Sequence, residues 1–240
     1  MTVLLISDVH ARYEVINTQI RHAQQIGGHQ ISQVVVLGDF GFFADDMHQY
    51  FRRQKNRFLR PVACLDGNHE DYGALPDLAA QYADVVTYLP RGCVHEMGPW
   101  RGLCLGGTRY MDASSTPRGC EITTADIEAC LAHDPAAVDV VLSHDCPTDI
   151  GLQSTSGCAH YGPPGVPQMR RLAERFSPRW WVFGHHHRWF DRVQNGTRYL
   201  GLPLSWSGYA VLQVDGEIAV VSHELAIGTR SWWRRWLGLG

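Results

Sequence analysis

Side chains able to bind a divalent metal ion recur in short polar segments along most of the chain. They are carboxylates, imidazoles and one carboxamide, and no thiol is among them. The set comprises Asp8, His10, Asp39, Asn68, His144, His185 and His187. Oxygen and nitrogen donors of this kind suit Mn, Fe, Zn, Ni or Co better than an ion that prefers thiolates. The residue types therefore predict a divalent metal centre.

Two such ions side by side would serve phosphoryl transfer. A pair held roughly 3.5–4 Å apart can clamp the attacking and the leaving oxygen of the displacement. The two ions need a shared carboxylate to offset their mutual repulsion, and Asp39 is the expected bridge. Asp8 and His10, two residues apart, can both turn toward one ion. His185 and His187 have the same spacing and can reach different ions.

Each of these polar segments follows a short apolar run that has the pattern of a buried strand. The main runs lie at 3–6, 34–37, 61–65, 138–142 and 180–183. Helical periodicity lies between them, over 14–26, 45–59, 123–132 and 166–176. Such alternation predicts an α/β protein. In open α/β sheets, sites are built at the carboxyl ends of strands, where all seven side chains are expected to lie.

Five short blocks resemble, in order, those of the calcineurin-like metallophosphoesterases. They are Asp8-Val9-His10, Gly38-Asp39, Gly67-Asn68-His69-Glu70, Ser143-His144-Asp145 and Gly184-His185-His186-His187. The resemblance implies a four-layer α-β-β-α sandwich, in which two mixed β-sheets are flanked by helices. We expect this domain to span 1–225 and a Trp/Arg-rich tail to occupy 226–240.

The resemblance also implies roles for the individual residues. The first ion would be bound by Asp8, His10, Asp39 and His187. The second ion would be bound by Asp39, Asn68, His144 and His185. A water or hydroxide bridging the ions would be the nucleophile, and His69 would act near the leaving oxygen as general acid or transition-state stabiliser. Manganese is the first choice for both ions, with Fe, Zn, Ni and Co as alternatives.

Segments outside the ligands bear on the substrate. The stretch 38–43 lacks the arginine of the GDxVDRG form found in Ser/Thr protein phosphatases, and Arg12 and Arg109 are candidate phosphate contacts in its place. The stretch 143–147 is similar to a segment of RNA lariat debranching enzymes. Segments 38–42, 66–70 and 89–92 look like those of small bacterial metallophosphoesterases.

These resemblances favour hydrolysis of a phosphodiester, in a nucleotide or a nucleic acid. Two alternatives are a phosphomonoesterase or protein phosphatase, and a non-catalytic, metal-binding scaffold subunit of the same fold. The long loop over 146–164 is expected to be a lid or a substrate-selecting rim, or else a plain connector. The tail is expected to pack on its own domain, or to contact a membrane surface, bases or a partner.

Composition sets bounds on partners and compartment. With 21 Lys and Arg against 24 Asp and Glu, the formal charge is −3, so no overall basic field attracts nucleic acid or an anionic membrane. Seven cysteines without a CxxC pair argue against a disulfide framework and fit a reducing compartment. No signal peptide or transmembrane segment is predicted. We therefore expect a cytoplasmic protein without stable membrane insertion, and the sequence carries no signal for an oligomeric state.

Overall fold

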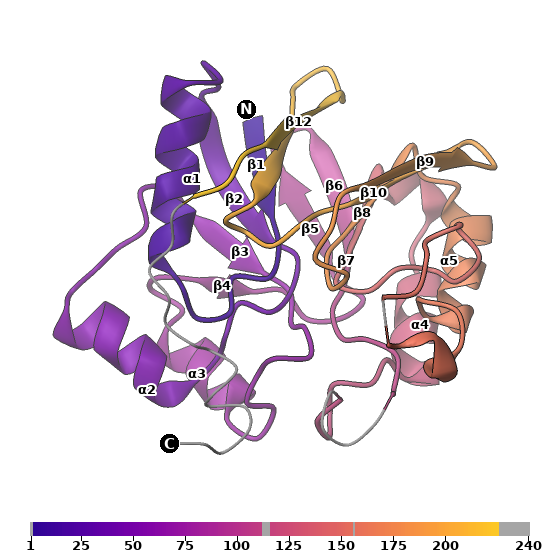
Figure 1. Cartoon of the computed structure of the whole chain (residues 1–240), viewed down its shortest axis with the longest axis horizontal. Helices are drawn as coiled ribbons and strands as arrows, with labels where there is room; N and C mark the ends of the chain where they lie inside the picture. The colour runs from indigo at the N-terminus through magenta and orange to yellow at the C-terminus, as the bar shows by residue number, and fades with distance from the viewer. Residues whose placement is uncertain (1, 112–115, 156, 226–240) are drawn as a thin grey trace.

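The computed structural model describes residues 2–111, 116–155 and 157–225, and it arranges them as two six-stranded sheets packed face to face (Figure 1). The first sheet has the order β12-β11-β1-β2-β3-β4. Its strands are β1 (Thr2–Ile6), β2 (Ile31–Val36), β3 (Val62–Cys64), β4 (Thr87–Tyr88), β11 (Gly208–Leu212) and β12 (Ile218–Ser222). Strands β1 to β4 are parallel, whereas β11 and β12 run antiparallel to their neighbours, so the sheet is mixed.

The second sheet has the order β5-β6-β7-β8-β10-β9 and is also mixed. Its strands are β5 (Val94–Met97), β6 (Trp100–Leu105), β7 (Val140–Ser143), β8 (Trp180–Phe183), β9 (Phe190–Gln194) and β10 (Thr197–Gly201). Strands β6, β7, β8 and β10 are mutually parallel, and β5 and β9 are antiparallel edges.

Helices cover the outer face of each sheet, as Figure 1 shows. The first sheet is covered by α1 (Glu14–Gln25), α2 (Ala44–Met47), the π-helical turn His48–Arg53 and α3 (Leu75–Gln81). The second sheet is covered by α4 (Thr124–Leu131) and α5 (Arg170–Phe176), with short 3₁₀ turns at Pro135–Ala137, Ala159–Tyr161 and Pro167–Met169. The predicted four-layer α-β-β-α sandwich is therefore confirmed.

Burial on both faces explains why the central strands have continuous apolar runs. In β1, Val3 and Leu5 pack into the layer between the sheets, while Leu4 and Ile6 pack beneath the helices of the first sheet. Strand β7 does the same: Leu142 faces the inter-sheet layer and Val141 faces the helices of the second sheet. Because successive side chains of a strand point to opposite faces, a strand covered on both sides has no polar alternation.

Two details of the expected secondary structure are wrong. The helix expected over 45–59 ends at Arg53, because Lys55 adopts the left-handed conformation (φ 58°), which a continuing helix cannot contain. Helix α3 is absent from the sequence prediction, since it buries only Leu75 and Leu78 and so carries too short an apolar pattern. The tail expected over 226–240 lies outside the described residues.

A buried ion pair links the loop after β3 to the segment between β4 and β5. Asp66 is fully buried, and its Oδ2 lies 2.7 Å from Nη2 and 3.0 Å from Nε of Arg91. The hydroxyls of Tyr72 and Tyr88 also donate to this carboxylate. Arg91 further donates to the carbonyl oxygens of residues 119–121. Arg91 therefore holds the loop after β3 together with the segment over 119–121.

Replacing Arg91 by glutamine is expected to lower the free energy of unfolding by about 3–5 kcal/mol, because it leaves the Asp66 charge buried without its partner. Urea unfolding would measure this. The matched control is Arg198→Gln, whose partner Asp191 is, like Arg198, nearly half exposed (43% and 45%). That change should cost under about 1 kcal/mol. Equal effects of the two substitutions would contradict this account of Arg91.

The seven cysteines are free thiols in this structure. Within the described ranges, no helix has the length and apolar character needed to cross a membrane.

Candidate metal centre

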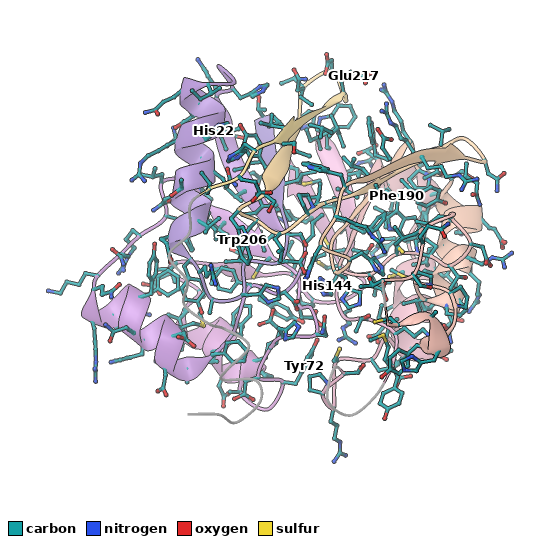
Figure 2. The ribbon with its side chains drawn as sticks, viewed as in Figure 1. His22, Tyr72, His144, Phe190, Trp206 and Glu217 are labelled. Atoms are coloured by element: carbon teal, nitrogen blue, oxygen red, sulfur yellow. The ribbon has the colours of Figure 1, made fainter. Side chains whose placement is uncertain are left out.

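Five strands deliver the seven candidate ligands to one edge of the sandwich. Asp8 and His10 follow β1, Asp39 follows β2, Asn68 follows β3, His144 follows β7, and His185 and His187 follow β8. Strands β1 to β3 are parallel neighbours in one sheet, and β7 and β8 are parallel neighbours in the other. Figure 2 places His144 near the middle of the molecule, between its two halves. These strand ends lie close together, because the side chains that follow them approach one another.

The first group comprises Asp8, His10, Asp39 and His187. One potential ligand atom of each lies within 4.8 Å of those of the other three. His187 Nε2 is 3.2 Å from Asp8 Oδ1, and His10 Nδ1 is 3.7 Å from Asp39 Oδ2. The three ligands other than His187 are buried. This group has the composition expected for a site that binds one divalent ion.

The second group is centred on the side-chain oxygen of Asn68. Asn68 Oδ1 lies 3.1 Å from His144 Nε2 and 3.0 Å from His185 Nδ1. Asp39 Oδ1 lies 3.5 Å from the same nitrogen of His144. Asp39 therefore directs one carboxylate oxygen toward each group.

The hydrogen bonding of these groups fits the presence of cations. Asp39 Oδ2 is buried and accepts no hydrogen bond from any residue that the structure describes. His144 donates its Nδ1–H to the carbonyl oxygen of Leu37 at 2.8 Å, so in the neutral ring Nε2 presents a lone pair to Asn68 Oδ1. Buried acceptors that face one another are unfavourable unless a cation or a proton lies between them. The donor set thus fits divalent metal ions.

Protonation equilibria at the centre agree with this reading. Burial lowers the pKa of His10 to about 4 and that of His185 to about 3, so both rings are neutral at physiological pH, as metal ligation requires. Burial acts in the same direction on His144 and His187, but nearby Asp8 and Asp39 outweigh it and raise the pKa of both rings. A metal ion would take the place of the protons that these carboxylates otherwise attract.

Strained backbone marks the same residues. Asp8, His10, Asp39, His185 and His187 all adopt φ angles between 50° and 64°. Left-handed backbone in non-glycine residues costs of order 1–3 kcal/mol each and persists only where the surroundings impose it. Main-chain hydrogen bonds from Asp8 N to Gly38 O and from His10 N to Asp39 O hold two of these loops together. The strain turns side chains at three of the five strand ends toward one point.

The glycine that precedes a ligand in several blocks has a steric reason. A Cβ atom on Gly38 would lie 2.1 Å from His144 Nδ1, and one on Gly67 would lie 2.0 Å from Asp39 Oδ1. Both distances are far below van der Waals contact, so a side chain at either position would displace a candidate ligand. The Gly-Asp and Gly-Asn pairs of the sequence therefore reflect the close approach of neighbouring ligand loops.

Glu70 shapes the loop that carries Asp39. Its carboxylate accepts hydrogen bonds from the backbone N–H groups of Phe40, Gly41 and Phe42. It therefore organises this loop and does not belong to either ligand group.

His69 lies beside the first group without being part of it. Its Nε2 is 3.9 Å from Asp39 Oδ2, and its ring centroid is 4.9 Å from that of His10. Its backbone N–H donates to Asp39 Oδ1 at 2.8 Å. The side chain is partly exposed, so it can face a molecule that enters from solvent.

The two arginines expected to contact phosphate are placed differently. Arg12 lies over the ring of Trp206, 4.7 Å from its centroid, and that ring is 6.4 Å from the ring of His10 (Figure 2 labels Trp206). Arg109 donates to the carbonyl oxygens of Tyr161 and Pro163 and so holds the loop over 146–164. Arg12 therefore stands beside the centre, whereas the Arg109 guanidinium is engaged by the loop.

Trp206 was missed by the sequence analysis. It lies in the loop between β10 and β11, away from the recognisable blocks, so no spacing rule indicates it. Ser205 before it is buried, and its hydroxyl donates to Asp8 O. This contact ties the Trp206 loop to the first ligand loop.

The His/Asp cluster at the carboxyl ends of strands from two facing sheets has the composition of a metal-binding site. The family model described as calcineurin-like phosphoesterase matches residues 1–189. The chain belongs to this family. A comparison with curated protein sequences gives no significant match.

Solved structures share the fold at low identity. The protein TT1561 of Thermus thermophilus is 13% identical with a TM-score of 0.61, over 92% of this chain and 98% of that one. The phosphopantetheinyl hydrolase PptH of Mycobacterium tuberculosis is 14% identical with a TM-score of 0.53, over 95% and 98%. GAP50, described as the anchor in the inner membrane complex of Plasmodium, is 9% identical with a TM-score of 0.53, over 100% and 95%. At these identities the likeness concerns the fold alone.

Proposed function

We propose that this chain is a binuclear metal-dependent hydrolase of phosphodiesters, carried in nucleotides or nucleic acid. The observation that carries the proposal is the position of Asp39. Its Oδ2 faces the group around His10 and its Oδ1 faces the group around His144, at 3.7 Å and 3.5 Å. A carboxylate shared in this way is what two neighbouring cations need.

The two groups would hold one ion each. The first ion would be bound by Asp8, His10, Asp39 and His187, and the second by Asp39, Asn68, His144 and His185. Divalent ions bound there, manganese being the first choice, would polarise the phosphoryl group and make a water nucleophilic at neutral pH. The charge of two such ions outweighs that of the two carboxylates, so the centre would attract an anionic substrate.

The other side chains at the centre would orient the substrate and move a proton. His69 would donate a proton to the leaving oxygen, or stabilise the charge that develops there, from its partly exposed position beside Asp39. Arg12, supported by Trp206, would contact a phosphoryl oxygen or a neighbouring phosphate. Arg109 as a second substrate contact stays a prediction, and its guanidinium would have to leave the carbonyl oxygens of the loop.

A diester suits the centre better than a monoester. Segment 38–43 carries no arginine, so one guanidinium fewer is available to a doubly charged phosphate monoester. The alternative of a phosphomonoesterase or protein phosphatase would need that missing charge.

The scaffold alternative gains support from the fold shared with GAP50, which is described as an anchor. It is disfavoured because His69, which belongs to neither ligand group, lies beside Asp39 with its ring partly exposed, and a scaffold that only binds metal has no need of it.

Hydrolysis of two chromogenic esters tests the proposal. Protein freed of metal with a chelator and then supplied with Mn, Ni, Co or Fe should hydrolyse bis-p-nitrophenyl phosphate faster than p-nitrophenyl phosphate. The chelator-treated protein without added metal is the control and should be inactive. Preference for the monoester would favour the phosphomonoesterase alternative, and no turnover with any of the four metals would reject the enzyme.

A further inference from the structure

His185 is held by a side chain from outside the ligand loops. Its Nε2 lies 3.2 Å from Thr108 Oγ1, while its Nδ1 lies 3.0 Å from Asn68 Oδ1. Thr108 is buried and follows β6, in a segment that contributes no candidate ligand. One ring nitrogen of His185 therefore faces the second group, and the other faces a hydroxyl.

The direction of these hydrogen bonds follows from Asp145. Thr108 Oγ1 lies 2.7 Å from Asp145 Oδ2, and the backbone N–H of Arg109 donates to the same oxygen at 3.2 Å. The N–H of Cys146 donates to the other oxygen at 2.7 Å. Backbone amides can only donate, so both oxygens act as acceptors and the single hydroxyl proton of Thr108 points to Asp145.

The oxygen of Thr108 is then left as an acceptor for His185. It must receive the Nε2–H of the imidazole, which leaves Nδ1 as the nitrogen with the free lone pair. That nitrogen is the one directed at Asn68 and the second group. The chain Asp145–Thr108–His185 thus selects one of the two tautomers of the ring.

Asp145, Cys146 and His186 also lie close enough together to suggest a cation site of their own. Hydrogen bonds account for this cluster, because His186 Nε2 lies 3.1 Å from Asp145 Oδ1 and the two backbone amides already donate to the carboxylate. His186 Nε2 therefore faces Asp145 and Cys146, outside the two ligand groups.

We propose that Thr108 is a positioning residue that fixes the nitrogen His185 presents to the second metal ion; this inference rests on the proposed function. The other imidazole of the second group needs no such side chain, because His144 donates its Nδ1–H to a main-chain carbonyl, that of Leu37. At the second site, a main-chain carbonyl therefore fixes the tautomer of His144, and the Thr108 hydroxyl fixes the tautomer of His185.

The backbone at Thr108 is anchored independently of its hydroxyl. Its N–H donates to Cys120 O at 3.2 Å, and its carbonyl accepts from Ile122 N at 3.0 Å. Valine has nearly the same shape as threonine, so Thr108→Val would remove the hydroxyl from an anchored loop. Thr108→Ser would keep the hydroxyl and remove the methyl group.

The test is a titration of the metal-free full chain with Mn²⁺ by calorimetry. The wild type is expected to bind two ions, and Thr108→Val to bind the second about 10–100-fold more weakly while the first is unchanged. Thr108→Ser should restore the affinity. Thr197→Val, which removes another buried threonine hydroxyl on β10, is the matched control and should behave as the wild type. Electron paramagnetic resonance should show coupled manganese pairs in the wild type, Thr108→Ser and Thr197→Val. In Thr108→Val it should show isolated manganese ions instead.

The possible outcomes distinguish a failure of the role of Thr108 from a failure of the proposed function. If Thr108→Val binds two ions with wild-type affinities, the role of Thr108 is overturned and the proposed function stands. The same holds if Thr197→Val loses as much affinity for the second ion as Thr108→Val does. Fewer than two ions in the wild type would overturn the proposed function together with the role of Thr108. Should Thr108→Val fail to fold, the ¹⁵N shifts of His185 in the zinc-loaded wild type decide: a protonated Nε2 supports the role of Thr108, and a protonated Nδ1 rejects it.

Discussion

Asp39→Asn should abolish most of the hydrolytic activity. Asparagine keeps the size of the side chain and can still accept the backbone N–H of His69. It removes the negative charge that faces both ligand groups, so two cations would repel each other without compensation. Losing about 4 kcal/mol of charge stabilisation in the transition state corresponds to a fall of about 10³-fold in kcat. Steady-state kinetics with saturating Mn²⁺ would measure this.

A surface carboxylate provides the control for Asp39. Asp191→Asn removes an equal charge from a half-exposed pair with Arg198, outside both ligand groups, and should leave kcat unchanged. Circular dichroism should show both variants folded. An Asp39→Asn variant that is folded, binds two ions and keeps wild-type kcat would contradict the bridging role of Asp39.

His69→Gln is expected to lower kcat by about 10²–10⁴-fold, the range of general acid–base catalysis, while both metal ions remain bound. The reason is its place beside Asp39 but outside both groups, with its ring partly exposed. The loss should depend on the leaving group. p-Nitrophenolate leaves readily without a proton, so its release should be affected less than that of the alkoxide from a dinucleotide.

The pattern of losses distinguishes the two roles open to His69. A larger loss with the dinucleotide indicates proton donation, whereas equal losses indicate stabilisation of charge in the transition state. His48→Gln, at an exposed position on the π-helical turn, is the matched control and should have no effect. A His69→Gln variant that keeps full activity with both esters, or that loses a metal ion, would show that the assignment of His69 is wrong.

The layers and the meeting point of the ligands could be predicted from the sequence because both depend on local patterns. Continuous apolar runs indicate strands buried on both faces, as β1 and β7 are. A ligand directly after such a run lies at the carboxyl end of its strand. The paired spacing of Asp8 with His10 then brings both into one group.

Contacts between distant segments could not be predicted in this way. Thr108 reaches His185 across 77 positions of sequence, and Trp206 meets Arg12 from a loop without a recognisable motif. Arg109 was predicted to contact phosphate in place of the arginine that segment 38–43 lacks, but its guanidinium donates to two loop carbonyls. Such partners depend on how β6, β8 and their loops pack, and no periodicity in the chain encodes that arrangement.

The most direct test of the binuclear centre is a crystal structure of the Mn-loaded protein with anomalous data at the manganese edge. We expect two anomalous peaks roughly 3.5–4 Å apart, with an oxygen of Asp39 bound to each. His10 and His187 should flank the first peak, and His144 and His185 the second. A single peak at this edge of the sandwich, or manganese bound by other residues, would contradict the proposed centre.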